Sequence, residues 1–126
     1  MQLKKLEKIA VSALEDKKAK EIVTFDVRPL TALYDTMIIA SGDSSRQVKA
    51  LADHVRDTVK AAGGVIVGLE GDKTAEWVLV DCGDFIVHVM QSAIRTYYNL
   101  EELWSMRPAK IKQKLATNSD SEPTDS

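Results

Sequence analysis

The turn Gly42–Arg46 has the residue types and the position of an anion site. It follows the apolar run Thr36–Ala40 and opens an amphipathic segment. A helix N-terminus offers backbone amides and the positive end of a dipole to a phosphate. The turn lacks the Lys-Ser/Thr end of a P-loop and the three glycines of a dinucleotide fingerprint. Nucleotide binding here therefore stays open beside the plainer interpretation, in which Ser44 only caps a helix.

A strand followed by Gly-x-Ser and a helix also resembles the opening motif of nucleotidyltransferases. Two-metal chemistry needs paired carboxylates on a neighbouring strand. The segment Val65–Glu70 offers only Glu70 at its end, and Asp81 and Asp84 bracket a turn without an Asp-x-Asp pair. Because these ligands are missing, we expect a binding protein and not an enzyme.

Two histidines and one cysteine are the other candidate ligands. His54 falls near the polar side of the second amphipathic segment, so a surface position is expected. His88 lies in an apolar stretch, either as a hydrogen-bonded, half-buried sheet residue or as part of an interface. Cys82 cannot form an internal disulfide and is expected to be a small buried residue. Zinc needs more nitrogen or sulfur ligands than this, so no metal or cofactor is expected.

The segment Trp77–Met90 is predicted to form a hairpin, because Gly83-Asp84 fits a two-residue type II′ turn. The register then pairs Cys82 with Phe85, Asp81 with Ile86, Val80 with Val87, Leu79 with His88, Val78 with Val89 and Trp77 with Met90. One face of the hairpin is wholly apolar and should pack under helices. The other mixes large apolar groups with a carboxylate and an imidazole, as interface cores often do. Trp77 and Met90 are core residues instead if helices cover both faces.

Periodicity and turn residues place the remaining elements. Ser44 and Gln47 form a capping-box pattern at a helix start, and Gly63-Gly64 suits a helix end. We expect a helix in 2–19, a strand in 21–27, a central strand at 36–40, a helix from 44 to 62, a strand at 65–69, and a short helix within 94–104. The fold class is α/β: a single domain with a mixed sheet of about five strands and helices packed mainly on one face.

Composition limits the class of protein. The 126 residues fit one domain, expected at 1–106, and the polar segment 107–126 is expected to be a disordered tail. No apolar run reaches the length of a membrane span, and the first residues lack a secretory signal, so a cytoplasmic protein is expected. The net charge of −2 argues against a surface that wraps nucleic acid and favours a protein partner.

The chain resembles the ribosomal silencing factor family, also called the Iojap family, over residues 5–105. No single motif is specific, but their combination is. The residues that carry the resemblance include Ala13–Ala19, Phe25–Val27, Ile39–Val48, Ala52–Val55, Gly68–Gly71, Glu76–Asp81, Gly83-Asp84, Val87–Met90 and Tyr98–Trp104.

The resemblance implies a nucleotidyltransferase-like fold without the enzyme's catalytic carboxylates. It also implies a function, which is binding of the large ribosomal subunit through large-subunit protein fourteen. The bound domain would sterically block joining of the small subunit and repress translation when nutrients are scarce. No turnover, cofactor, membrane or direct nucleic-acid contact is required for this mechanism.

The two-faced hairpin and the resemblance together suggest a protein-binding site. We expect Trp77, Leu79, His88 and Met90 to dock on the ribosomal protein, Glu70 and Asp81 to offer carboxylates to its basic groups, and Tyr98 to extend the rim. A homodimer that closes the same face in the free protein is an open alternative.

Overall fold

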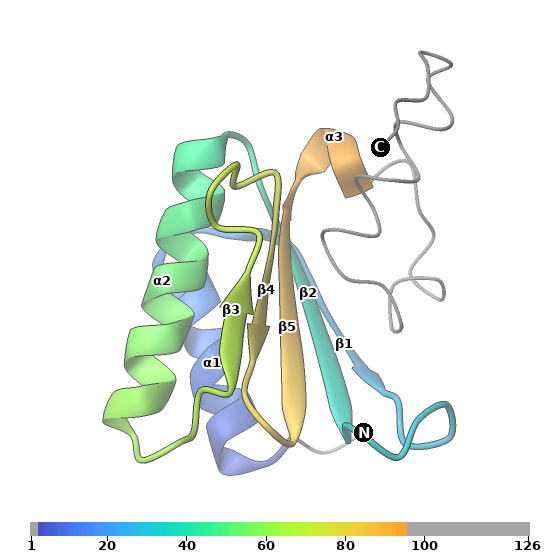
Figure 1. The fold of residues 1–126 in the computed structure, drawn as a ribbon. Coiled ribbons are helices and arrows are strands. Elements are labelled where there is room, and N and C mark those ends of the chain that lie inside the picture. Colours follow the sequence, from blue (N-terminus) through green and yellow to red (C-terminus); the bar gives the residue numbers. More distant parts are fainter. Residues whose placement is uncertain (1–2, 96–126) are drawn as a thin grey trace.

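The computed structural model describes residues 3–95, which form a sheet with two longer helices against it (Figure 1). The elements in chain order are α1 (Lys5–Asp16), β1 (Lys20–Asp26), β2 (Thr36–Gly42), α2 (Ser45–Ala61), β3 (Gly68–Glu70), β4 (Trp77–Asp81), β5 (Phe85–Gln91) and α3 (Ser92–Arg95).

The sheet has five strands in the order β1-β2-β5-β4-β3. β2 and β5 are parallel, and the other neighbouring pairs are antiparallel. All residues of β2 are buried, as expected for a continuous apolar strand with neighbours on both sides. The predicted α/β class with a mixed five-stranded sheet is confirmed, and the arrangement is compatible with the nucleotidyltransferase-like fold.

α1 and α2 lie on one face of the sheet and also pack against each other (Figure 1). Their apolar residues recur at helical spacing and therefore form one stripe on each helix. We call the sheet surface beneath them the helix face. Its buried apolar residues are Ile38, Ala40, Val78, Val80, Cys82, Phe85, Val87 and Val89, and they pack in one cluster with Ala10, Leu14, Leu51 and Val55 of the helices.

The start of α2 partly corrects the predicted capping box. Ser44 is the N-cap, and its Oγ accepts a hydrogen bond from the Gln47 backbone N at 3.1 Å. The reciprocal bond does not return to Ser44: the Gln47 Oε1 accepts from the backbone N of Asp43 at 2.7 Å. The side chain of Gln47 therefore secures the strand-to-helix turn one residue earlier than the motif implies.

The end of α2 follows the prediction. Gly63 has φ 93°, a left-handed conformation that favours glycine, and its N–H donates to the Lys60 carbonyl at 3.1 Å. A Cβ at Gly64 would lie 2.6 Å from Cγ1 of Val59, so this position needs the close approach of a glycine. The two positions thus favour glycine for different physical reasons, which are the backbone conformation at Gly63 and the close packing at Gly64.

The third strand is shorter than predicted and begins later. β3 covers Gly68–Glu70, whereas the prediction was 65–69. Val65 and Val67 are exposed, at 65% and 64%, and Val67 bonds through its backbone N to the Asp81 carbonyl at 2.7 Å. The β-branched residues suggested a full strand, but only the part from Gly68 onward pairs with β4 as a ladder.

The hairpin formed by β4 and β5 has the predicted register. Trp77 lies opposite Met90 and Leu79 lies opposite His88. Gly83 has φ 86°, the sign that a type II′ turn requires at its first central residue, and the Cys82 N donates to the Phe85 carbonyl at 2.9 Å. Strand alternation therefore divides the hairpin residues between the two faces of the sheet as expected.

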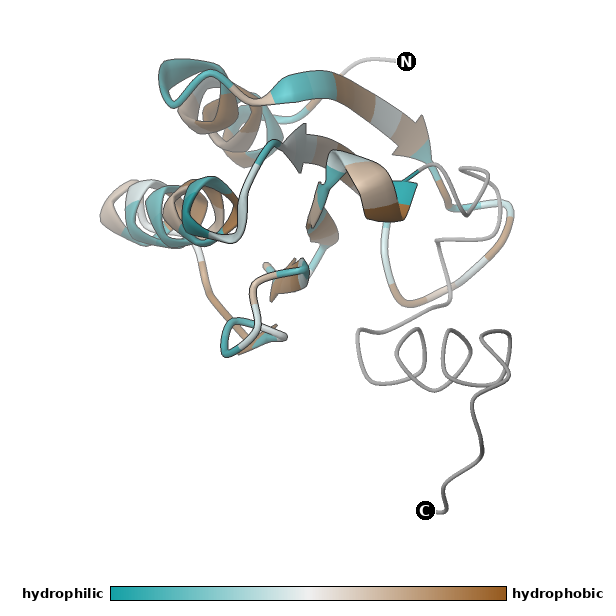
Figure 2. Ribbon diagram, turned by 90° about the horizontal axis from the view of Figure 1, so that it is seen from above, coloured by the Kyte–Doolittle hydropathy of each residue, from teal (hydrophilic) through white to brown (hydrophobic). Residues whose placement is uncertain are grey.

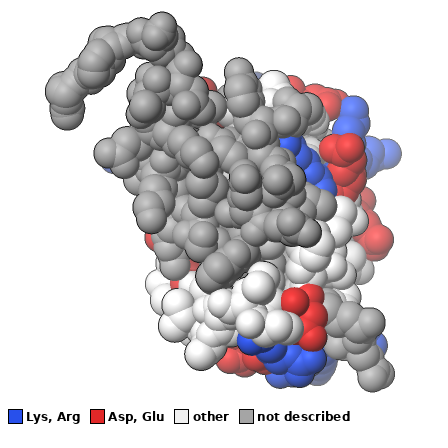
Figure 3. Space-filling view, turned by 90° about the vertical axis from the view of Figure 1, so that its right-hand side faces the viewer, with Lys and Arg blue, Asp and Glu red and all other residues white. Residues whose placement is uncertain are grey.

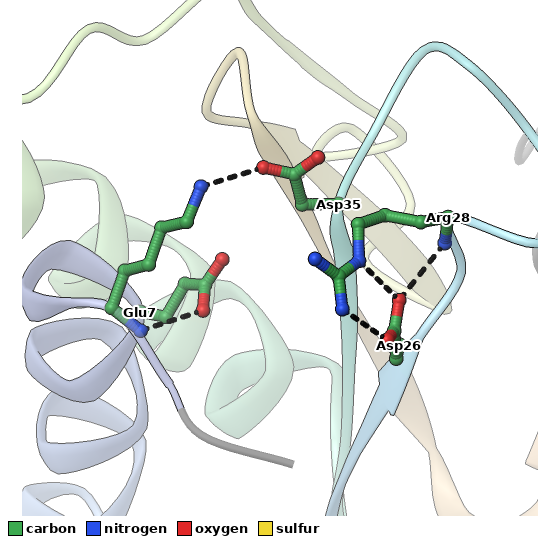
Figure 4. A network of polar contacts seen from close by, with 5 residues as sticks. Glu7, Asp26, Arg28 and Asp35 are labelled. Carbon is green, nitrogen blue, oxygen red and sulfur yellow. Dashed lines mark hydrogen bonds and ion pairs between the residues drawn. The ribbon is translucent and has the colours of Figure 1, made fainter.

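Polar contacts fix the end of the molecule where α1 begins (Figure 4). Lys4 donates through Nζ to Asp35 at 2.8 Å and through its backbone N to Glu7 at 2.9 Å. Nearby, the guanidinium of Arg28 bonds both oxygens of Asp26. The Lys4–Asp35 contact ties the start of the first helix to the segment that enters β2.

Three expectations concern residues outside the described part of the chain. Tyr98, the tail 107–126 and most of the predicted helix in 94–104 belong there; α3 accounts only for the beginning of that helix. The boundary of the domain at residue 106 is likewise an expectation.

Candidate functional site: the second face of the sheet

The face opposite α1 and α2 carries its own buried cluster, which we call the second face. It consists of Val27, Met37, Ile39, Trp77, Leu79, Ile86, His88 and Met90. Phe25, Tyr34 and Ile94 are partly buried against it. Viewed from above, along the direction of Figure 2, the two longer helices lie together on the other side of the strands. The structure therefore brings the four predicted docking residues of β4 and β5 together.

A buried hydrogen bond joins Trp77 and His88 on this face. Nε1 of Trp77 donates to Nδ1 of His88 at 2.8 Å, and the rings meet edge to face with centroids 5.6 Å apart. Because Nδ1 accepts this bond, the neutral imidazole carries its hydrogen on Nε2. His88 is fully buried, at 0% exposed, so it lies deeper than the half-buried position expected from the sequence.

The apolar docking residues are buried as well. Trp77 is 3% exposed, and Leu79 and Met90 are 0% exposed. Free in solution, these side chains are thus part of a core and do not form an exposed patch. Any direct contact between them and a partner requires the second face to be uncovered first.

Glu70 and Asp81 lie at the margin of the second face. Glu70 is exposed on β3, the edge strand, opposite Leu79, and cross-strand partners share a face. Asp81 is half-buried; its carboxylate accepts from Tyr34 Oη at 2.7 Å and from the backbone N of Gly83 at 3.0 Å. Six of the seven predicted contact residues therefore gather here, and Tyr98 lies outside the described residues.

Tyr34 is the residue that the sequence analysis missed. It falls between the strands predicted at 21–27 and 36–40, yet its hydroxyl reaches Asp81 across the intervening β5. The parallel pairing of β2 with β5 carries the residues before β2 toward the β4–β5 turn, where Asp35 N donates to the Asp84 carbonyl at 2.7 Å. Only that long-range pairing identifies the contact, and no local motif signals it.

The turn Gly42–Arg46 is built as a helix start. The amides of Asp43 and Gln47 already donate to Gln47 Oε1 and Ser44 Oγ, respectively. A Cβ at Gly42 would lie 3.2 Å from Cγ2 of Val48, so the glycine lets the helix approach the strand. Two amides that a phosphate would need are thus committed to capping, which weighs against the nucleotide-binding alternative.

The carboxyl ends of the parallel strands are joined by polar side chains. Nη1 of Arg95 donates to Ser41 Oγ at 2.8 Å and to the carbonyl of Glu21, and Gln91 Nε2 donates to Ser45 Oγ at 2.9 Å. The Arg95 side chain is only 11% exposed, and burial lowers its pKa from the usual value. These contacts fix the strand ends to β1 and to the start of α2.

The other candidate ligands have structural surroundings. Cys82 is 6% exposed, and burial raises the pKa of its thiol to about 12, so the thiolate is disfavoured. His54 lies 3.5 Å from Asp16, with its side chain 30% exposed. Within residues 3–95, no three His, Cys, Asp or Glu side chains are grouped to hold a metal ion. No helix of that same range has the length and apolar character needed to cross a membrane.

Comparison with known proteins decides the family. The family model described as "Ribosomal silencing factor during starvation" matches residues 1–126. The chain belongs to the ribosomal silencing factor family. A relative from Chromobacterium violaceum, "Ribosomal silencing factor RsfS", is 53% identical over 104 residues, which is 82% of this chain and 85% of the relative.

Two further relatives support the family and its fold. A crystal structure of a Chromobacterium violaceum protein has a TM-score of 0.77 and 51% identity, covering 85% of this chain and 89% of that one. "Protein Iojap, chloroplastic" from Arabidopsis thaliana is 34% identical over 90 residues, which is 71% of this chain and 37% of that protein. The resemblance to the ribosomal silencing factor and Iojap family is thus confirmed.

Proposed function

We propose that this ribosomal silencing factor binds the large ribosomal subunit through large-subunit protein fourteen and blocks joining of the small subunit. The mechanism is steric: a small domain occupies surface that the two subunits need for contact, so translation is repressed when nutrients are limited. Family membership supports the ribosomal role. The chemistry of the second face is the observation that carries the choice of contact surface.

The second face has the composition of a recognition surface. Trp77 and Met90 supply large contact areas, and truncation of such an anchor at the centre of an interface costs roughly 2 kcal/mol or more. The hydrogen bond from Trp77 to His88 fixes the orientation of the indole before any partner arrives. No hydrogen bond of this kind is recorded between the clustered strand side chains of the helix face within residues 3–95, because those residues are apolar.

Burial of the second face adds a kinetic consequence. Since Trp77 is 3% exposed, the partner meets the margin first and the buried residues only after this face opens. Association that waits for such a change is slower than the roughly 10⁵ to 10⁷ M⁻¹s⁻¹ typical of preformed protein surfaces. Stopped-flow binding to large subunits should therefore show a rate that levels off as subunit concentration rises.

The acidic margin provides the first contact in this mechanism. Glu70 and Asp81 attract basic groups of the ribosomal protein, and exposed charges of this kind act mainly on association rate and salt sensitivity. Glu70→Gln should slow association, whereas Asp57→Asn, which removes an exposed carboxylate from α2, should leave the rate unchanged. Equal rates for the two variants would remove Glu70 from the proposal.

Sucrose-gradient sedimentation tests the function itself. Purified protein is mixed with isolated large subunits, and small subunits are added afterwards. Co-migration with the large subunit together with a smaller joined-ribosome peak supports the proposal. Protein that stays at the top of the gradient contradicts binding, and co-migration without any loss of joined ribosomes contradicts the block.

A homodimer through the second face is the second arrangement that the same surface allows. In that arrangement the second face is covered by the partner protomer in the free protein and by the ribosomal protein in the complex. Analytical sedimentation over a range of concentrations tests it, since a mass that stays monomeric at all of them rules the dimer out.

A further inference from the structure

We propose that Lys17, Lys18 and Arg46 form a cationic patch that contacts ribosomal RNA phosphates when the protein is bound to the large subunit. The inference rests on the proposed function, because it concerns a second contact within the same complex. It adds a nucleic-acid contact on the helix side of the molecule, away from the second face.

The patch joins two segments that are distant in sequence. Nε2 of Gln47 donates to the carbonyls of Lys17 and Lys18, at 3.4 and 3.3 Å. This bond holds the turn between α1 and β1 against the first turn of α2, where Arg46 immediately precedes Gln47. Figure 2 looks down on this end of the molecule and shows hydrophilic segments at both places. Lys17, Lys18 and Arg46 are all exposed and belong to two segments that the fold holds side by side.

The two cations nearest in sequence, Lys20 and Lys49, are engaged in ion pairs, whereas none is recorded for these three within residues 3–95. Lys20 pairs with Asp43 at 2.8 Å and Lys49 pairs with Asp53 at 3.3 Å. Among the ion pairs of residues 3–95, none involves a side chain of the patch. The nearest acidic neighbour in sequence, Asp16, faces His54 at 3.5 Å. The three side chains are thus not committed to an ion pair within residues 3–95 and can reach an external anion.

The backbone strengthens the positive potential. α2 starts at Ser45, and the N-terminal end of a helix carries about half a positive charge. Asp43 offsets part of this field but is itself paired with Lys20. Figure 3, which looks onto the β1 edge, shows acidic and basic side chains interleaved on that side. The proposed contact is a local patch of three side chains and not a surface that wraps RNA.

The chemistry of the patch favours phosphate over a protein surface. Protein interfaces have apolar centres, and the large hydrophobic residues exposed in the described structure lie elsewhere: Leu30, Leu33, Val65 and Val67. The patch consists of long cationic side chains, with the exposed carboxylates of Asp16 and Asp43 at its margin. Cationic side chains of this kind position a protein on a phosphate backbone without reading bases. A surface rich in RNA phosphates, such as that of a ribosomal subunit, matches this chemistry.

Salt dependence of binding to intact large subunits tests the inference. The variant Lys17→Gln, Lys18→Asn, Arg46→Gln removes the patch; asparagine is chosen at position 18 because Lys18 has φ 62°. The matched control is Lys5→Gln, Lys8→Gln, Lys60→Gln, which removes three exposed cations elsewhere on α1 and α2. Each phosphate contact contributes about 0.7 to 0.9 to the slope of log K against log salt.

The patch variant is expected to bind more weakly at low salt, with a slope about 2 to 3 smaller than wild type, while the control keeps the wild-type slope. If both variants behave like wild type, or both lose the same slope, the patch is not an RNA contact. A photo-crosslinker placed at position 46 gives the identity of the neighbour: adducts to ribosomal RNA support the inference, and adducts only to ribosomal protein overturn it. Failure of the wild type to bind large subunits would instead contradict the proposed function.

Discussion

The two faces of the sheet differ in the contacts that their side chains make. On the helix face, strand residues such as Val78, Val87 and Val89 meet α1 and α2 through apolar contacts alone. On the second face, apolar residues of similar burial surround an ordered polar pair, Trp77 and His88, with Tyr34 and Asp81 bonded at the margin. Burial alone does not distinguish the helix face from the second face, which we propose as the recognition surface; the directional polar contacts do.

The largest expected effect on stability comes from a matched pair of cavity-forming substitutions, one on each face. Ile38→Ala on the helix face and Leu79→Ala on the second face each empty a fully buried site, and each should lower the free energy of unfolding by about 2 to 5 kcal/mol. Urea denaturation measures both. Under conditions where both variants stay folded, only Leu79→Ala should also weaken binding to large subunits. Equal binding losses would erase the functional distinction between the faces.

The next effect concerns the polar pair. Trp77→Phe keeps an aromatic ring but removes the N–H that bonds His88, so a buried acceptor loses this donor. The unfolding free energy should fall by about 1 to 3 kcal/mol. A double-mutant cycle with His88→Leu should then show coupling, since the second change removes the acceptor as well. Strictly additive effects in the cycle would show that the bond contributes nothing specific.

A smaller effect is expected at the start of α2, on the helix side. Ser44→Ala removes the cap that receives the Gln47 amide and should cost about 1 kcal/mol of stability. Ser12→Ala, an exposed position within α1, is the control and should change little. Thermal unfolding compares them. Affinity for large subunits should stay at the wild-type value, and a tenfold loss in the capping variant would implicate this turn directly in binding.

The smallest effect is a pH dependence at the surface. Hydrogen bonds from Arg28 lower the pKa of Asp26 from 3.8 to about 2. Because the folded-state pKa is depressed, the resulting stabilisation is present above pH 3.8 and is lost as the pH falls through about 2. An NMR titration of the Asp26 carboxyl should show the low pKa in the wild type and a value nearer 3.8 in Arg28→Ala. An unshifted pKa of the Asp26 carboxyl in the wild type would contradict the hydrogen bonds from Arg28.

Local chemistry predicted most of the fold. The two-residue turn at Gly83 determined the complete hairpin register, and the continuous apolar run of β2 identified a central strand. The residues 65–67 misled the prediction, since β-branched side chains there are exposed outside the ladder. A strand propensity says which residues suit a pleated sheet, but pairing depends on what the neighbouring strand offers.

The candidate site was predictable only in part. Alternation placed Trp77, Leu79, His88 and Met90 on one face. Their depth did not follow from the hairpin, because burial depends on everything that packs above the sheet. The Trp77–His88 bond joins diagonal neighbours and depends on side-chain rotamers, and the contact from Tyr34 to Asp81 depends on parallel pairing across the chain. Sequence periodicity contains neither piece of information.

Site-specific crosslinking to the large subunit tests the central claim most directly. A photo-reactive residue at position 70 samples the margin of the second face, and one at position 60 samples the helix layer as a control. The proposed function predicts that position 70 crosslinks to large-subunit protein fourteen and that position 60 does not. Crosslinks to that protein from position 60 alone, or crosslinks from position 70 only to other components, would contradict docking through the second face.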